Sequence, residues 1–394
     1  MRPSPSLFAV PFAVLALATS SAAQTSATPT AEDYRRDALA LPALIEADYA
    51  YIERLPGGAF PNTDILKAEA QAVHDRAGLL RYAEHALTAL ADHHAITGAS
   101  FADSWAVTPS YSDLWIEPEN GGWTVTSVRA GSPAQAAGVK AGDRLTAVGD
   151  QSTDKAVAAF WREMGLSPDD DRAGYAARVL AAGRRDRPRD LTITAADGTT
   201  RRLNLPSLYS MQRDTPAVES GLEGDAWVIR INDVLGDEAT IAAFDAAMAG
   251  ARDGQTVIID LRDTPSGGNT VVARGIMGWF VDAPSAYQIH ALPSEARRTG
   301  IERRWIEQVM PRPDKRHRGP VVVRVGRWTG SMGEGLAIGL HAQGARVVGD
   351  PMAGLLGAIY DLRLPATGLV VKIPVERLYA VDGTPREQFR PEPN

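Results

Sequence analysis

Residues 31–95 carry apolar side chains three and four positions apart, the spacing that forms one face of a helix. Leu79, Leu80, Ala83 and Leu87 illustrate this spacing. The turn-forming sequence PGGAFPN at 56–62 interrupts the pattern. We therefore predict a helical region whose last helix ends close to the sequence DHHAITGAS at 92–100.

Between residues 115 and 205 the pattern changes to short strands and turns. Its centre, TVTSVRAGSPAQAAGVKAGDRLTAVGDQ at 124–151, has glycines where turns and a helix end need dihedral angles that other residues rarely adopt. This segment resembles a PDZ domain, which binds an extended peptide as an added strand beside a helix. The resemblance implies a peptide groove between the strand that contains Leu114, Trp115 and Ile116 and a helix around 155–164. The polar stretch at 167–186 is longer than a compact domain of this kind needs. We expect it to cover the groove or to contact the C-terminal part.

From residue 221 onward, apolar strand patterns alternate with helical patterns. Residues 227–231 and 257–261 are expected strands, and residues 238–251 and 271–280 are expected helices. Buried strands that alternate with helices indicate an α/β layered core. We therefore predict that the chain is an α/β protein with a separate, strand-rich middle domain.

Composition narrows the range of partners. The formal net charge of −7 argues against nucleic acid or an anionic membrane surface, because both favour a basic protein face. The chain contains no cysteine, which excludes disulfides, thiolate metal sites and a lipid anchor on cysteine. No metal and no cofactor are expected.

The first 23 residues have the features of a secretory signal peptide. An early Arg2 precedes an apolar stretch at 7–18, and the small residues Ser21 and Ala23 stand at cleavage spacing. The apolar stretch is too short to span a bilayer. We therefore expect an exported soluble protein, periplasmic or secreted, without a stable membrane anchor.

The sequence GRWTGSMGEG at 326–335 places Ser331 between a strand-like run at 319–325 and a helical pattern at 335–341. Ser331 and Glu334 together match a capping box, in which both side chains satisfy free amides of the first helical turn. A nucleophile at a strand-to-helix junction is the alternative. This choice depends on whether the chain also supplies a base and an oxyanion site.

The sequence DLRDTPSGGNT at 260–270 follows an expected buried strand. The carboxyl end of such a strand is a favoured ligand site, and Gly267 and Gly268 allow backbone amides to approach a substrate closely. Taken alone, the segment is an ordinary turn. Combined with the later serine segment, one of these glycine amides and the amide of Met332 could stabilise the oxyanion of acyl transfer.

In chain order, these segments resemble the secreted, PDZ-containing serine peptidases of the tail-specific (C-terminal processing) and tricorn-core family. The resemblance covers the helical segment, the PDZ segment, the DLR…GG loop, the TGS loop and an acidic site near the C-terminus. It implies a crotonase-like β/α catalytic core. The hydrolase motif G-x-S-x-G fits less well, because Thr329 stands at its first position.

The family activates its serine either with a lysine or with a histidine and an acid. The tail-specific branch places the lysine about two dozen residues after the serine, but the first lysine here is Lys372. The tricorn-like branch takes its histidine from the region before the PDZ domain. Of the seven histidines, only His93 and His94 lie there at the end of the helical region, and the resemblance identifies His94 as the general base.

The C-terminal sequence AVDGTPREQFRPEP is similar to the closing motif of the tricorn-like branch. The resemblance implies that Glu387 orients the histidine, with Asp382 and Glu392 as lesser candidates. A surface glutamate is the competing interpretation. The loop at 263–268 is one residue longer than the family pattern, so Gly267 and Gly268 are not ranked as oxyanion donors.

These features predict an exported serine peptidase that cleaves polypeptides at C-terminal or unfolded segments. The expected divisions are a signal peptide (1–23), a tether and helical region (24–107), a PDZ-like domain (108–207) and a catalytic core (208–394). The competing hypothesis is an inactive relative whose PDZ domain binds peptides while the core acts as a scaffold. A hydrogen bond between His94 and Ser331 would favour the enzyme.

Overall fold

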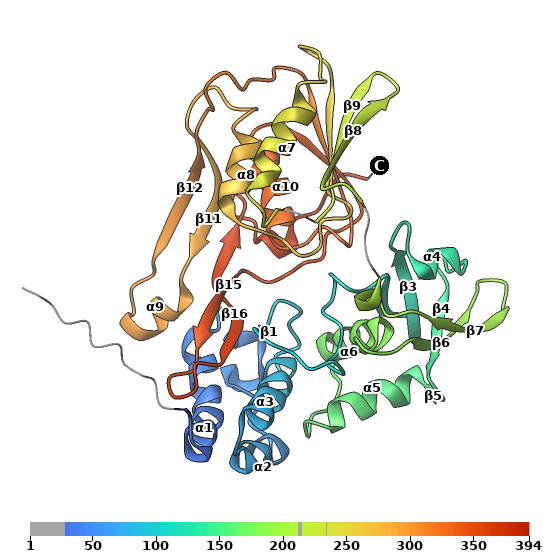
Figure 1. Cartoon of the computed structure of the whole chain (residues 1–394), viewed down its shortest axis with the longest axis vertical. Helices are drawn as coiled ribbons and strands as arrows, with labels where there is room; N and C mark the ends of the chain where they lie inside the picture. The colour runs from blue at the N-terminus through green and yellow to red at the C-terminus, as the bar shows by residue number, and fades with distance from the viewer. Residues whose placement is uncertain (1–27, 212–214, 234, 394) are drawn as a thin grey trace, which may run out of the picture.

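The computed structural model describes residues 28–211, 215–233 and 235–393, so the expected signal peptide lies outside the described residues. Figure 1 shows three parts: N-terminal helices in blue, a middle domain in cyan and green, and a C-terminal domain from yellow to red. The C-terminal domain lies above the other two in this view. A long strand pair, β15 and β16, extends from it toward the N-terminal helices.

The N-terminal part is helical, as the spacing of its apolar residues predicts. Each α-helix begins at a side-chain cap, provided by Thr30, Thr63 and Asp75 in turn. Their apolar faces form a core in which Leu41 and Leu79 are fully buried. The elements are α1 (Ala31–Asp48), η1 (Ile52–Arg54), η2 (Pro56–Gly58), α2 (Asp64–Ala72), α3 (Arg76–Thr88) and the short strand β1 (Ile96–Thr97).

The middle domain is a six-stranded antiparallel sheet with three helices. Its strand order is β2-β3-β4-β6-β7, and β5 pairs with β4. The strands are β2 (Leu114–Glu119), β3 (Gly122–Val128), β4 (Arg144–Val148), β5 (Gln151–Ser152), β6 (Arg189–Thr194) and β7 (Thr200–Leu205). The helices are α4 (Pro133–Ala136), α5 (Thr153–Arg162) and α6 (Asp170–Ala182), followed after β7 by η3 (Leu208–Ser210). The polar stretch at 167–186 therefore forms a helix of its own, α6.

The C-terminal domain contains a five-stranded sheet with the order β14-β13-β10-β9-β8. Strands β9, β10, β13 and β14 run parallel, so their carboxyl ends meet at one edge. The sheet strands are β8 (Val218–Glu223), β9 (Ala226–Ile231), β10 (Val257–Asp260), β13 (Val321–Val325) and β14 (Arg346–Gly349). The helices are α7 (Ala239–Met248), α8 (Thr270–Met277), α9 (Pro293–Thr299), α10 (Met332–Ala342) and the short η4 (Arg386–Gln388). This mixed α/β arrangement confirms the predicted fold class.

A second five-stranded sheet joins the end of the N-terminal part to the C-terminal domain. Its order is β1-β16-β11-β12, and β15 also pairs with β16. The strands are β11 (Ser285–Ala291), β12 (Arg304–Val309), β15 (Ala358–Arg363) and β16 (Val370–Tyr379). Ile96 pairs with Lys372 across β1 and β16. The loop that carries His94 is therefore held against the C-terminal domain.

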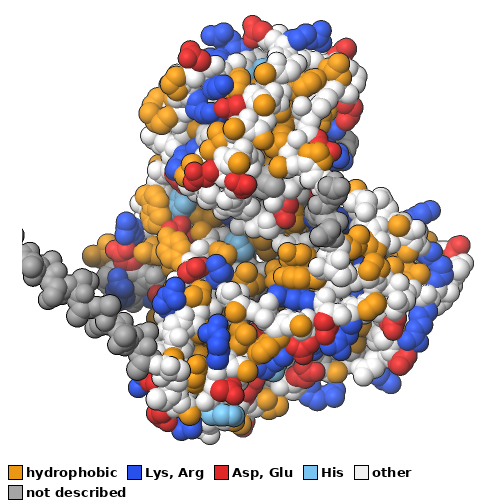
Figure 2. Space-filling view, viewed as in Figure 1, with side chains coloured by type: hydrophobic (Ala, Val, Ile, Leu, Met, Phe, Trp, Pro, Cys, Tyr) orange, Lys and Arg blue, Asp and Glu red, His pale blue; other side chains and the backbone are white. Residues whose placement is uncertain are grey.

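The surface mixes charges of both signs. On the face shown in Figure 2, Lys and Arg side chains are interspersed with Asp, Glu and apolar groups. Within the described residues, the chain has no helix with the length and apolar character needed to cross a membrane.

Candidate active site

Ser331 stands at the junction between β13 and α10 with an unusual backbone conformation. Its dihedral angles are φ 50° and ψ −114°, whereas a residue that only caps a helix adopts extended angles. Such strain in a non-glycine residue often marks a functional position. The Glu334 half of the expected capping box is present, since its carboxylate accepts from the Ser331 amide at 2.8 Å. The Ser331 hydroxyl lies at hydrogen-bond distance from a histidine.

That histidine is His94, in the loop between α3 and β1. Its Nε2 lies 3.0 Å from Ser331 Oγ, and its Nδ1 lies 2.6 Å from the carbonyl oxygen of Leu356. A carbonyl only accepts, so Nδ1 carries the proton and the Nε2 lone pair faces the serine hydroxyl. Burial, with a smaller contribution from Arg386, lowers the pKa of His94 to about 4. The imidazole is therefore neutral at physiological pH and can accept a proton.

Asp92 holds the backbone of this histidine loop. Its carboxylate accepts from the His94 amide at 2.8 Å and from the Tyr49 hydroxyl at 2.9 Å. Burial raises the pKa of Asp92 to about 6 despite these hydrogen bonds. Asp92 contacts the main chain of His94 rather than its ring, so it positions the loop.

Glu387 does not occupy the position that the family resemblance implies. The Leu356 carbonyl takes the Nδ1 side of His94, and Glu387 Oε2 is buried without a hydrogen-bond partner among the described residues. The lesser candidates are engaged elsewhere. Asp382 accepts from the Thr384 amide at 2.9 Å, and Glu392 pairs with Arg346 at 2.9 Å. In this structure a backbone carbonyl, rather than a carboxylate, fixes the tautomer of His94.

The residue next to Glu387 contributes more directly. Arg386 is buried, and its Nη2 donates to the carbonyls of Leu355 at 2.9 Å and Gly357 at 2.8 Å, on either side of Leu356. It also lies 3.9 Å from the fully buried Glu334 carboxylate. Arg386 thus holds the loop whose carbonyl orients His94.

Glu334 connects this loop to the nucleophile. Its carboxylate accepts from the amides of Ser331 at 2.8 Å, Gly354 at 2.9 Å and Leu355 at 3.2 Å. Burial raises the pKa of Glu334 to about 7, although Arg386 and the three amides lower it. The sequence identified Glu334 only as a helix cap. Its hydrogen bonds to the loop at 354–357 could not be predicted, because the two segments are separated in the sequence.

The two candidate oxyanion glycines have different surroundings. A Cβ added to Gly267 would lie 2.4 Å from Ser331 Cβ and 3.0 Å from the Met332 amide nitrogen. A Cβ added to Gly268 would instead meet the backbone of Leu235 at 2.1 Å. Gly267 therefore faces the serine and the Met332 amide, whereas Gly268 packs against the loop after β9. Among the described residues, no acceptor is recorded for the amides of Gly267 and Met332.

Two neighbouring loops hold this arrangement together. The loop after β10 and the loop after β13 pair through a parallel bridge between Thr264 and Thr329. Thr264 donates its amide to the Trp328 carbonyl at 2.9 Å and accepts from the Gly330 amide at 3.0 Å. This bridge lies past the carboxyl ends of both strands, where we predicted the site from the sequence.

Among the described residues, no lysine is recorded in contact with Ser331. Lys372 lies within β16 and pairs with Asp361 at 2.8 Å. Among the residues that the structure describes, no group of three acidic or histidine side chains is arranged to hold a metal ion.

The three expected peptide-groove residues are covered. Leu114, Trp115 and Ile116 are each at most 3% exposed. The helix α6 packs along β2, and Arg178 of α6 donates to the Ile116 carbonyl at 3.4 Å. A Cβ on Gly174 of α6 would lie 3.6 Å from the Pro118 ring. The polar insertion therefore covers the groove, which is one of its two expected roles, and a peptide cannot add to β2 while α6 is in place.

Trp115 instead joins the middle domain to the nucleophile loop. It packs in a small buried cluster with Trp328, Ala353 and Leu355. Trp328 Nε1 donates to the Ser112 carbonyl at 2.8 Å. The prediction that Trp115 lines a peptide site is thus wrong for this conformation, because its side chain belongs to the contact between the two domains.

A serine with a strained backbone, a neutral histidine at its hydroxyl and nearby amides without acceptors form the arrangement of a serine peptidase. The sequence comparisons agree with this class. Residues 124–160 match the family model described as PDZ domain, and residues 226–393 match the model described as peptidase family S41. The chain therefore carries a PDZ domain and a peptidase domain of family S41.

Similar solved structures share this fold. Mature CPAF complexed with lactacystin is 14% identical, with a TM-score of 0.57 over 92% of this chain and 94% of that chain. The photosystem II D1 C-terminal processing protease is 17% identical, with a TM-score of 0.55 over 92% of this chain and 93% of that chain. The comparison with curated proteins gives no match.

Proposed function

We propose that this protein is an exported serine peptidase that hydrolyses polypeptides through an acyl-enzyme on Ser331. The observation that carries the proposal is the 3.0 Å contact between His94 Nε2 and Ser331 Oγ, with Nδ1 held by the Leu356 carbonyl. The match to peptidase family S41 supports the same chemistry. The processing protease among the similar structures supports a polypeptide substrate.

The proposed reaction begins when Ser331 Oγ attacks the carbonyl carbon of the scissile peptide bond. His94 Nε2 takes the hydroxyl proton, and the carbonyl oxygen becomes an oxyanion between the amides of Met332 and Gly267. The C–N bond then breaks, and the imidazolium returns its proton to the departing amine. A water molecule, deprotonated by His94, attacks the acyl-enzyme and releases Ser331 with the carboxylic acid product.

The electrostatics favour the neutral base. The low pKa of His94 keeps it deprotonated, and the Leu356 carbonyl stabilises the transient imidazolium only through its dipole. The helix α10, which begins at Met332, directs its positive end toward the developing negative charge. We therefore assign Ser331 as nucleophile and His94 as general base. Leu356 and Arg386 act as positioning residues.

The test is hydrolysis of a pool of unfolded proteins by the chain without residues 1–23. Ser331→Ala and His94→Ala should each lower kcat by about 10⁴-fold, because the two residues act as one unit. His341→Ala, at the far end of the nucleophile helix, is the matched control and should retain activity. Cleavage that survives Ser331→Ala would sink the proposal.

The alternative is a peptide-binding scaffold without catalysis. It would be supported if the purified protein bound peptides but never cleaved them. The filled groove disfavours this alternative, since α6 lies along the strand that a peptide would join. Export rests on the signal-peptide pattern of residues 1–23 and would be tested by recovery of the processed chain outside the cytoplasm.

A further inference from the structure

A buried histidine outside the catalytic centre lies between two glutamates. His290 of β11 places its Nδ1 2.7 Å from a carboxylate oxygen of Glu376 in β16, and its Nε2 3.2 Å from one of Glu307 in β12. His290 and Glu376 are 6% and 4% exposed. We call His290, Glu376 and Glu307 the ion group. It joins three strands of the sheet that also holds the loop of His94.

Each carboxylate of the ion group has a further partner. The Tyr360 hydroxyl of β15 donates to Glu376, and Arg274 of α8 pairs with Glu307. When His290 is protonated, two cations therefore balance two anions. The other aromatic, titratable or charged side chains around the ion group are Trp305, which stacks on His290, Tyr287 near Glu307, and Arg303 over the Trp305 ring.

This environment favours the charged form of His290. Burial alone would lower its pKa, but the contacts with Glu307 and Glu376 raise the pKa of His290 from 6.5 to about 8. Because the pKa is raised in the folded protein, the stabilisation is complete below the ordinary value and is lost as the pH rises through about 8. The ion group is therefore intact at neutral pH and weakens in mildly alkaline solution.

The neutral ring has a different partner. Gln288 Nε2 lies 3.0 Å from His290 Nε2. An amide nitrogen only donates, so this hydrogen bond needs an unprotonated Nε2, whereas the bond to Glu307 needs a protonated one. A Cβ added to Gly335 would lie 3.1 Å from Gln288 Oε1, so Gln288 also lies against the nucleophile helix α10. Loss of the proton exchanges Glu307 for Gln288 and leaves one buried carboxylate of the ion group without its counter-charge.

The backbone of Glu376 touches the loop that orients His94. Glu376 pairs with Ala358 across β15 and β16, and a Cβ added to Gly357 would lie 2.0 Å from the Glu376 carbonyl oxygen. Gly357 directly follows Leu356, whose carbonyl oxygen lies 2.6 Å from His94 Nδ1. A shift of Glu376 would therefore move the Leu356 carbonyl through residues that are in direct contact.

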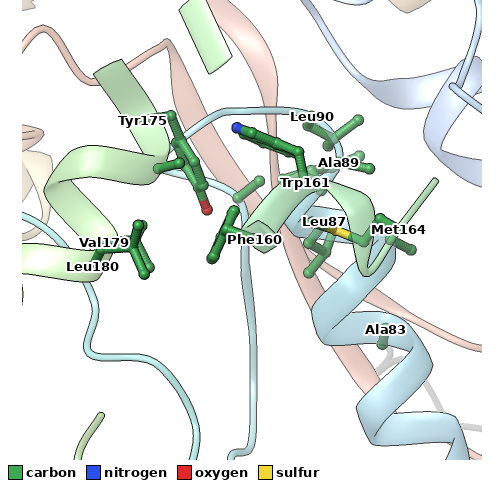
Figure 3. Close-up of a cluster of buried hydrophobic side chains, with 14 of the residues drawn as sticks. Ala83, Leu87, Ala89, Leu90, Phe160, Trp161, Met164, Tyr175, Val179 and Leu180 are labelled. Carbon is green, nitrogen blue, oxygen red and sulfur yellow. The ribbon is translucent and has the colours of Figure 1, made fainter. Parts of the chain in front are cut away.

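The His94 side of this contact depends on apolar packing instead. His94 follows α3, and Figure 3 shows Leu87 and Leu90 from the end of this helix and the turn after it beside Trp161 and Met164. These four side chains are at most 2% exposed. Apolar burial does not depend on protonation, whereas the ion group does. The Leu356 side is thus the pH-sensitive half of the contact.

We propose that the ion group positions the Leu356 carbonyl, and with it the His94 ring, and that loss of the His290 proton releases this carbonyl. The inference rests on the proposed function and concerns the regulation of the same site. His290 and Glu376 act as positioning residues, and together they set an alkaline limit to peptidase activity. His94 itself is already neutral in this range, so its own titration would set no such limit.

The coupling is read without turnover, from histidine ring NMR signals of Ser331→Ala lacking residues 1–23. The variants His94→Gln and His290→Gln assign the two rings. The His94 signals should shift with a midpoint near pH 8, the pKa of His290, rather than only near its own pKa of about 4. In the background of His290→Gln this shift should disappear. His94 signals that stay constant through pH 8, or that shift equally without His290, would overturn the proposal.

Two further variants test the role of the carboxylates. Glu376→Gln should move the midpoint to lower pH, because the imidazolium loses a counter-charge. Glu307→Gln, at the more exposed side of the ring, makes the same test if Glu376→Gln does not fold. The matched control is His85→Gln, which removes a histidine that pairs with Glu69 at 2.9 Å away from this sheet, and it should leave the midpoint in place. A midpoint unchanged by the loss of either carboxylate would contradict the proposal.

Turnover provides the second readout. The wild-type kcat should fall roughly tenfold as the pH rises through the titration of His290, as expected for a displaced base. His290→Gln should have a lower kcat at neutral pH and lack this fall, whereas His85→Gln should behave as the wild type does. An alkaline limb that persists in His290→Gln would overturn the proposal. A protein that shows the NMR coupling but never cleaves would support the coupling and contradict only the proposed peptidase function.

Discussion

The residues of the catalytic centre are in contact with one another in this structure, whereas the PDZ groove is covered. Ser331 and His94 are within hydrogen-bond distance and ready for proton transfer, whereas the groove strand β2 is covered by the chain's own helix α6. The two regions touch through Trp115 and Trp328. The Ser331–His94 pair is therefore assembled while the groove is covered, so under the proposed function peptide capture and peptide cleavage would be separable events.

We expect the largest loss of activity from a substitution at Gly267. Gly267→Ala would place a methyl group against Ser331 and strain a backbone with φ 77°, so kcat should fall about 10³-fold. Gly254→Ala is the matched control, because Gly254 has φ 74° and open space around its Cβ position. Thermal melting should show a loss of stability in both variants, larger in Gly267→Ala because of its clash with Ser331, and kinetics should show a loss of activity in Gly267→Ala alone. Equal activity in both would contradict the placement of Gly267.

Removing Arg386 should have the next largest effect. Arg386→Gln frees the loop at 354–357 and should lower kcat about 100-fold at neutral pH, as expected for a displaced base. His94 must be neutral to accept a proton, so activity falls as the pH drops through its pKa of about 4. Without the nearby positive charge this pKa rises, and the acidic limb of kcat/KM should move to higher pH.

A pH profile for Arg390→Gln provides the control for that variant. Arg390 is exposed and lines the same small pocket as Arg386. Its loss should leave the acidic limb in place. If both variants shift the limb equally, a general change in charge, rather than the Arg386 contact, sets the pKa of His94.

The covered groove can be loosened by a change in α6, which also removes a hydrogen bond to His93, the residue before His94. Arg178→Ala removes the contact of α6 with the Ile116 carbonyl and should raise affinity for peptides with a free carboxyl end about tenfold, because the open state becomes more populated. Arg162→Ala, on the exposed side of α5, is the control. Fluorescence anisotropy would measure both. Tight peptide binding by the wild type would show that α6 leaves β2 readily in solution.

Glu387 should show the smallest effect. Since the Leu356 carbonyl occupies the Nδ1 side of His94, Glu387→Gln should change kcat by about threefold or less. Glu392→Gln serves as a surface control. A loss near that of His94→Ala would mean that the carboxylate reaches the imidazole during turnover, as the family resemblance implies.

The structure brings together several residues that the sequence singled out, and there is a physical reason for this. Ser331 and Gly267 belong to short segments that follow buried strands, and parallel strands bring their carboxyl ends together. Elimination among seven histidines left His93 and His94, and the family resemblance selected His94. In each case the candidate residue belongs to a motif of a few consecutive residues, which can be recognised in the sequence.

Other parts depend on contacts that side-chain identity does not reveal. The Nδ1 partner of His94 is a backbone carbonyl, which any residue could supply at position 356. The pairing of Glu334 with Arg386 joins two segments that are far apart in sequence. The polar insertion was visible, but its helix α6 could be placed on β2 only from the packing of Arg178 and Gly174.

His94, the proposed general base, lies 237 residues from Ser331 and 262 residues from Leu356, whose carbonyl contacts its ring. During synthesis the N-terminal helices and the PDZ domain emerge long before the segment that contains Leu356. A ribosome-bound or partly folded chain therefore contains the base without its orienting carbonyl. Under the proposed function, proteolytic capacity would therefore arise only when the segment with Ser331 and Leu356 has joined the part of the fold that carries His94.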